Sequence, residues 1–122
     1  MFIKALHNKP GIYSARLAKK HGSFYKAMKI ILNKLTNKKD RSATFICSLS
    51  FKYPKKKMIT VIGKVNGKIS KKILGKKGFG YDPIFIPNHQ KKTFGQMLKQ
   101  KKINIDHRYV AFKKLKKKIK IL

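Results

Sequence analysis

A change in the spacing of the apolar residues constrains the fold of this chain more than any other feature of its sequence. After Ser23, apolar residues recur at the spacing of a helix that packs one face on a core; they are Ala27, Met28, Ile31, Leu32 and Leu35. Residues 43–53 and 58–65 are instead rich in β-branched and aromatic residues, which is typical of strands. Both patterns in one chain predict an α/β (mixed α+β) fold with a mixed central sheet and flanking helices.

The N-terminal quarter predicts a short strand and one helix. Residues 2–6 alternate well enough for a short strand, and residues 8–11 predict a turn because Pro10 and Gly11 break regular structure. Ser23 is the expected N-cap of the helix that follows, since its hydroxyl can accept a hydrogen bond from a free backbone N–H.

The middle of the chain predicts several strands and one hairpin. Pro54 ends the strand 43–53, and the strand 58–65 follows it. Asn66-Gly67 is the strongest short hairpin signal known, so we expect residues 68–74 to return antiparallel. Residues 84–86 predict a short strand.

The C-terminal third predicts two helices. Thr93 and Gln96 form a capping-box pattern for a short helix through Lys99. Asp106 is the expected N-cap of a last helix, whose apolar stripe contains Ala111, Leu115 and Ile119. The sequence shows neither an internal repeat nor a linker.

The charge of the chain allows two interpretations. It has 33 Lys and Arg against 3 Asp and Glu, a net charge of +30. Lysines neutralise phosphates, so a lysine-rich RNA- or DNA-binding module is one hypothesis. The other is drift toward A/T-rich codons. We favour drift because the lysines are spread along the whole chain and few arginines accompany them.

The scarcity of metal-binding side chains excludes several kinds of site. A single cysteine, Cys47, excludes an internal disulfide framework and a multi-cysteine zinc site, and we expect it to be an inert core residue. Three carboxylates are too few for an all-carboxylate metal cage. No apolar run is long enough for a membrane span and no signal peptide is recognisable, so no membrane association and a cytoplasmic location are expected.

Two segments could bind a ligand. In residues 78–82, glycines allow close approach of the backbone, Phe79 could stack on a base, and Asp82 offers an acceptor. The alternative is that Phe79 and Tyr81 are ordinary core or hairpin residues around a tight turn. The second segment is His107-Arg108 at a predicted helix start, which suits an anion or a carbonyl oxygen; its alternative is a solvated basic face.

Taken together, five motifs resemble one family. They are Pro-Gly-Ile-Tyr-Ser-Ala-Arg at 10–16, Arg-Ser-Ala-Thr-Phe-Ile-Cys at 41–47, Gly-Phe-Gly-Tyr-Asp-Pro-Ile-Phe at 78–85, Lys-Thr-Phe at 92–94 and His-Arg at 107–108. In this order they resemble the inosine triphosphate pyrophosphatase family, also called dITP/XTP diphosphatase. The run at 78–83 is the most specific of them.

The resemblance implies an enzyme of the nucleotide pool. Its members hydrolyse ITP, dITP and XTP to the monophosphate and pyrophosphate with Mg²⁺, and they are usually cytoplasmic homodimers. Carried over by position, Phe79 would stack on the purine, and Gly80, Tyr81 and Asp82 would shape its pocket. Lys102 would contact the nucleotide, and His107 and Arg108 would contact the 6-oxo edge of the base.

Two departures from the family pattern affect the expected activity. Asp106 stands where the family has a serine. The family's N-terminal part, with a metal-binding Glu and the catalytic Asp, has no counterpart in this chain. Residues 1–122 are therefore expected to be the C-terminal two-thirds of one ITPase-like domain, with no catalytic or metal-binding residue of their own. Such a chain would be weakly active or inactive alone, would need a homodimer partner or a companion N-terminal fragment, or would be a degenerate remnant.

Overall fold

The centre of the fold is a five-stranded sheet in the order β2-β1-β3-β4-β5. The computed structural model describes residues 1–121. Every strand pairing in that part of the chain is antiparallel. The strands are β1 (Phe2–Ile3), β2 (Lys9–Pro10), β3 (Ser42–Phe51), β4 (Ile59–Ile69) and β5 (Phe85–Pro87). The expected α/β fold of helices packed against a sheet is confirmed, but the sheet is antiparallel and not mixed in the described residues.

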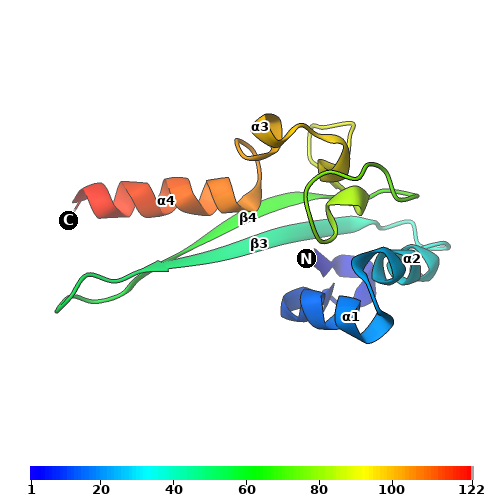
Figure 1. Ribbon diagram of the computed structural model, residues 1–122, viewed down its shortest axis with the longest axis horizontal. Coiled ribbons are helices and arrows are strands. Elements are labelled where there is room, and N and C mark those ends of the chain that lie inside the picture. Colours follow the sequence, from blue (N-terminus) through cyan, green and yellow to red (C-terminus); the bar gives the residue numbers. More distant parts are fainter. Residues whose placement is uncertain (122) are drawn as a thin grey trace.

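Helices cover the two faces of the sheet unequally. In Figure 1, α1 and α2 lie on one side of the sheet, and α4 runs along the β3–β4 ribbon on the other. The helices are α1 (Ser14–His21), α2 (Phe24–Lys34), α3 (Lys99–Lys102) and α4 (His107–Ile121). Short 3₁₀ turns are η1 (Lys4–Leu6), η2 (Gly11–Tyr13), η3 (Asp82–Ile84) and η4 (Phe94–Gln96). All these helices are too short or too polar to cross a membrane.

The helix expected after Ser23 is confirmed as α2. The Ser23 hydroxyl accepts a hydrogen bond from the backbone N–H of Lys26 at 3.1 Å. The apolar stripe of α2 faces the core: Ala27, Met28, Ile31 and Leu35 are buried. This side of the core meets the sheet at Ile3, which is also completely buried.

The hairpin expected at Asn66-Gly67 is wrong. Strand β4 continues through both residues to Ile69, and β3 and β4 are instead joined around Pro54. Gly67 pairs with Pro87 of β5, and a side-chain Cβ on Gly67 would collide with the Ile86 carbonyl. The glycine therefore allows β5 to approach closely, and it does not form a turn. Residues 70–74 accordingly run as irregular backbone.

The N-terminal predictions are partly correct. Strand β1 ends at Ile3 and gives way to η1, while residues 9–10 form the edge strand β2 beyond a turn at His7 and Asn8. Helix α1 is not predicted, because Ala18 is its only fully buried residue and the stripe is too short to detect.

The C-terminal caps are confirmed. Thr93 and Gln96 form the capping box, although η4 ends at Gln96 and α3 is a separate helix. The carboxylate of Asp106 accepts from the backbone N–H of Tyr109 at 2.8 Å, at the start of α4. Of the expected stripe of α4, Ala111 is buried against β4.

Aromatic rings form the centre of the core. Phe45 of β3 stacks on Phe85 with ring centroids 4.2 Å apart, and Phe94 stacks on both rings. Phe85 and Phe94 are completely buried. Cys47, expected in the core, is only half-buried on β3.

Candidate functional site

A cavity of about 660 Å³ lies between the glycine loop 78–82, α3 and the first turns of α4. Its walls combine apolar side chains with cationic groups and one carboxylate. The lining residues are Lys77, Gly78, Phe79, Met97, Lys99, Lys102, Ile103, Asp106, Arg108, Tyr109 and Phe112.

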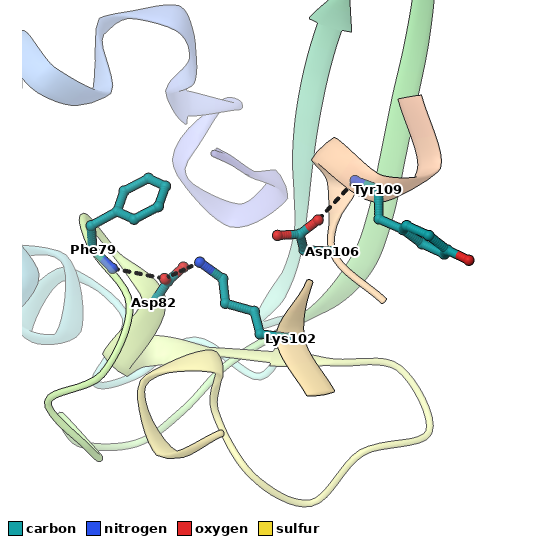
Figure 2. A network of polar contacts seen from close by, with 5 residues as sticks. All are labelled: Phe79, Asp82, Lys102, Asp106 and Tyr109. Atoms are coloured by element: carbon teal, nitrogen blue, oxygen red, sulfur yellow. Dashed lines mark hydrogen bonds and ion pairs between the residues drawn. The ribbon is translucent and has the colours of Figure 1, made fainter. Parts of the chain in front are cut away.

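The glycine loop is closed by its own carboxylate. Gly78 and Gly80 have φ of 74° and 64°, the left-handed region that glycine adopts without strain. Asp82 Oδ2 accepts from the backbone N–H of Phe79 at 2.9 Å, as Figure 2 shows. A Cβ on Gly78 would collide with that carboxylate. The loop therefore presents Phe79 in one fixed backbone conformation.

Tyr81 ties the same loop to α1. Its hydroxyl donates to the Ser14 carbonyl at 2.7 Å, and its ring packs edge-on against Phe24. Burial raises the pKa of Tyr81 to about 12, so the hydroxyl stays protonated and remains a donor. Tyr81 thus supports the cavity from behind and does not present its ring to a ligand.

Lys102 enters the site from α3 and pairs with Asp82. Lys102 Nζ lies 2.6 Å from Asp82 Oδ2, and the two side chains are 7% and 4% exposed. Figure 2 shows that this one carboxylate joins the ammonium to the Phe79 backbone. The ammonium also lies 4.4 Å from the centroid of the Phe79 ring. Burying two charges is tolerable here because they are paired and hydrogen-bonded.

Phe79 is the exposed aromatic of the cavity. The residue is 57% exposed, which is unusual for a phenylalanine in a cavity wall. The guanidinium carbon of Arg108 lies 4.2 Å from the ring centroid, at the distance of a cation–π contact. The guanidinium of Arg108, on an exposed side chain, covers part of the ring, and its displacement would open a flat surface for a planar ligand.

His107 is turned away from solvent at the start of α4. Its ring lies 5.0 Å from the Phe45 ring. Burial, reinforced by the charge of Arg108, lowers the pKa of His107 to about 4, so the imidazole is neutral at neutral pH. Its Nδ1 is buried, and none of residues 1–121 forms a hydrogen bond with it.

The structure brings together most of the residues expected from the sequence. Phe79, Lys102 and Arg108 line one cavity, and Asp82 holds two of them in place. Gly80 and Tyr81 lie behind the loop, and His107 lies toward the core. The apolar wall was not predicted; it consists of Met97, Ile103, Tyr109 and Phe112. Tyr109 and Phe112 are three residues apart on α4 and therefore lie on the same face of the helix. This spacing was the sequence signal from which part of the apolar wall could have been predicted.

The described part of the chain contains no group of three or more His, Cys, Asp or Glu side chains that could hold a metal ion. Asp40 is exposed and accepts from the Ser42 backbone, Asp82 is paired with Lys102, and Asp106 caps α4. These residues do not fit a metal centre.

The sequence of this chain is similar to that of one protein family over nearly its whole length. A model of the Ham1 family matches residues 1–118. The dITP/XTP pyrophosphatase of Clostridium perfringens (strain 13 / Type A) is 43% identical over 120 residues, covering 97% of this chain and 59% of that protein. The dITP/XTP pyrophosphatase of Staphylococcus aureus (strain MW2) is 42% identical over 106 residues, covering 87% of this chain and 54% of that protein.

Solved structures agree with the sequence matches. The Staphylococcus aureus Ham1 protein superimposes with a TM-score of 0.90 at 39% identity, covering 98% of this chain and 62% of that one. A HAM1 protein from Coxiella burnetii gives a TM-score of 0.88 at 32% identity, covering 99% and 64%. The chain thus spans about 59% of the length of its first curated relatives.

Proposed function

The chain belongs to the Ham1 family, and on that premise we propose that it forms the base-binding part of a nucleoside triphosphate pyrophosphatase. The substrates would be deaminated purine nucleotides such as ITP, dITP and XTP, in keeping with the names of its relatives. Residues 1–122 would then be one part of a single ITPase-like domain that works in the cytoplasm.

One observation carries this proposal: an exposed Phe79 ring stands in a cavity of about 660 Å³ between the cations of Lys102 and Arg108. A purine can stack on such a ring, and stacking of one base is worth about 1–3 kcal/mol. In this proposal Gly80, Tyr81 and Asp82 hold the ring in place, while Lys102 contacts the nucleotide.

The edge of the base would be read from the start of α4. Arg108 has only donors, so it pairs with the 6-oxo group of a deaminated purine. The 6-amino group of adenine offers the guanidinium no acceptor, and an unpaired donor in a cavity is costly. His107 packs against Phe45 behind the cavity, so in this proposal it supports the start of α4 and does not contact the base.

The same residues support binding better than hydrolysis. The family resemblance implies Mg²⁺, which would supply a Lewis acid for phosphate chemistry, but the described residues do not fit a metal centre. The three carboxylates already have backbone or lysine partners. We therefore expect weak or undetectable hydrolysis by this chain alone, with a second copy or another polypeptide supplying the missing groups.

The proposal is tested by nucleotide binding to the purified chain. Isothermal calorimetry with ITP and ATP compares two ligands that carry the same phosphates. We expect ITP to bind more tightly, and Phe79→Ala to weaken ITP binding about tenfold, since one lost stacking contact is worth about 1–3 kcal/mol. Tyr53→Ala removes an exposed aromatic on the β3–β4 connection and is the matched control. Equal affinity for both nucleotides, unchanged by Phe79→Ala, would contradict the proposal.

A further inference from the structure

We propose that Asp106 determines which purine this cavity accepts, by receiving the N1–H of a 6-oxopurine beside the O6 bound by Arg108. The inference rests on the proposed function of the cavity. It adds a second residue, besides Arg108, that forms a hydrogen bond with the edge of the base. It assigns to Asp106 a specificity role besides its role as the cap of α4.

The first oxygen of Asp106 is occupied and the second is available. Asp106 Oδ1 accepts from the Tyr109 N–H at 2.8 Å. Figure 2 shows the other oxygen on the side of the carboxylate that faces Lys102 and Phe79. Within residues 1–121, no donor forms a hydrogen bond or ion pair with this second oxygen. Asp106 is 5% exposed and lines the cavity, so its second oxygen is an acceptor available to a ligand in the cavity.

The second carboxylate near the cavity does not line it. Asp82 is paired with Lys102 and bonded to the Phe79 backbone, and it is not among the lining residues of the cavity. Asp106 is therefore the one carboxylate among the described lining residues, in a wall where every other charged group is cationic. A ligand group that binds to it must be a hydrogen-bond donor.

Neighbouring donor and acceptor groups fit one edge of a purine. Hypoxanthine carries its O6 acceptor next to its N1–H donor, which matches Arg108 and Asp106, two residues apart at the start of α4. Adenine reverses both groups, with an amino donor at C6 and an acceptor at N1. Both contacts would then be unfavourable, because donor faces donor and acceptor faces acceptor.

The substituent at C2 extends the prediction beyond the 6-oxo group. Xanthine carries a carbonyl oxygen at C2, directly beside N1, and this oxygen would face the Asp106 carboxylate. Among the deaminated purines, the cavity should therefore bind hypoxanthine more tightly than xanthine.

Two substitutions of Asp106 distinguish its proposed contact with the base from its role as the cap of α4. Asn and Ser are as effective as Asp at an N-cap. In Asp106→Asn the oxygen can keep the Tyr109 bond, and the amide then presents a donor to the cavity. In Asp106→Ser the cap remains and the second acceptor is lost. A thermal melt of each variant shows whether it folds.

The measurement is the ratio of dissociation constants among ITP, XTP and ATP for the wild type and both variants. The three ligands share one phosphate chain, so attraction by lysines cancels from the ratios. We expect the wild-type preference for ITP over ATP to fall about tenfold in Asp106→Asn, and the preference for ITP over XTP to fall in both variants. If both folded variants keep the wild-type preference for ITP over ATP and XTP, the proposed role of Asp106 is wrong, but the proposed function of the cavity is not affected. A wild type that does not distinguish ITP from ATP would instead refute the proposed function.

Discussion

Lys102 and Asp82 form a buried ion pair, with Nζ and Oδ2 only 2.6 Å apart. The same oxygen accepts the backbone N–H of Phe79. This carboxylate therefore fixes the loop that carries the exposed ring and the helix that closes the cavity beside it.

Removal of either partner should destabilise the fold. Lys102→Met would leave the carboxylate buried without its cation, and Asp82→Asn would leave the ammonium without its anion. Breaking a buried pair costs about 3–5 kcal/mol in each case. We expect the double variant to be more stable than the sum of the single effects predicts, by at least about 1 kcal/mol. Urea unfolding measures this, and strictly additive effects would show that the pair is not coupled.

A second anchor is Arg41, whose guanidinium binds three carbonyl oxygens. It donates to Ile69 at 2.8 Å, to Leu35 at 3.1 Å and to Ser70 at 2.6 Å. Arg41 thus joins the end of α2 to the end of β4.

Arg41→Lys should lose most of this anchor, because a lysine cannot reproduce the planar fork of donors. We expect a loss of about 2 kcal/mol in the free energy of unfolding, from carbonyls left without a donor. Arg16→Lys is the matched control, since Arg16 is exposed and contacts the Tyr13 ring. If both substitutions changed stability equally, the anchor would have no special role.

The elements predicted well from the sequence are those with a complete local signal. Helix α2 has both an N-cap and a full apolar stripe, and Ser23 and the buried face of the helix are as expected. The capping box at Thr93 and the cap at Asp106 are equally local. Helix α1 has neither signal, because its stability comes from packing against α2 and from the Tyr81 bond.

Long-range packing explains the principal error. Asn-Gly favours a turn only when the chain is free to reverse, and Gly67 is instead committed to pairing with β5. No signal near residue 67 shows that residues 85–87 will lie beside it. The candidate site follows the same rule: the motifs locate Phe79, Lys102 and Arg108, but only the fold brings the apolar wall to them.

Gly67→Ala therefore tests the corrected topology. An added methyl would collide with the Ile86 carbonyl and crowd the Pro87 backbone. We expect a loss of about 1–3 kcal/mol in the free energy of unfolding, as for other overpacked sites. Asn66→Ala is the control, because Asn66 is exposed and its side chain makes a single hydrogen bond, accepted from the Thr44 hydroxyl. A Gly67→Ala variant as stable as the wild type would mean that β5 does not pair there.

His107 should make stability depend on pH. Its pKa is about 4 in the folded chain, against an ordinary value of 6.5, chiefly because the ring is buried. Between these values the unfolded chain binds a proton that the folded chain does not, so the free energy of unfolding should fall as pH falls from 6.5 to 4. Above pH 6.5 this contribution should be constant. His107→Gln should show a smaller slope in urea unfolding across that window, and an equal slope in both proteins would exclude His107 as its source.

The highly positive chain should bind nucleic acid without sequence specificity. Basic residues outnumber acidic ones 33 to 3 and are spread along the chain, so they can neutralise phosphates of any sequence. We expect a fluorescent single-stranded RNA to bind at low salt, with an affinity that falls steeply as salt rises. Phe79→Ala should leave this RNA affinity nearly unchanged while it weakens ITP binding, because the ring contributes stacking and no charge. Anisotropy titrations at two salt concentrations measure both effects. RNA binding that resists salt, prefers one base and requires Phe79 would instead indicate that the cavity serves a nucleic-acid-binding module.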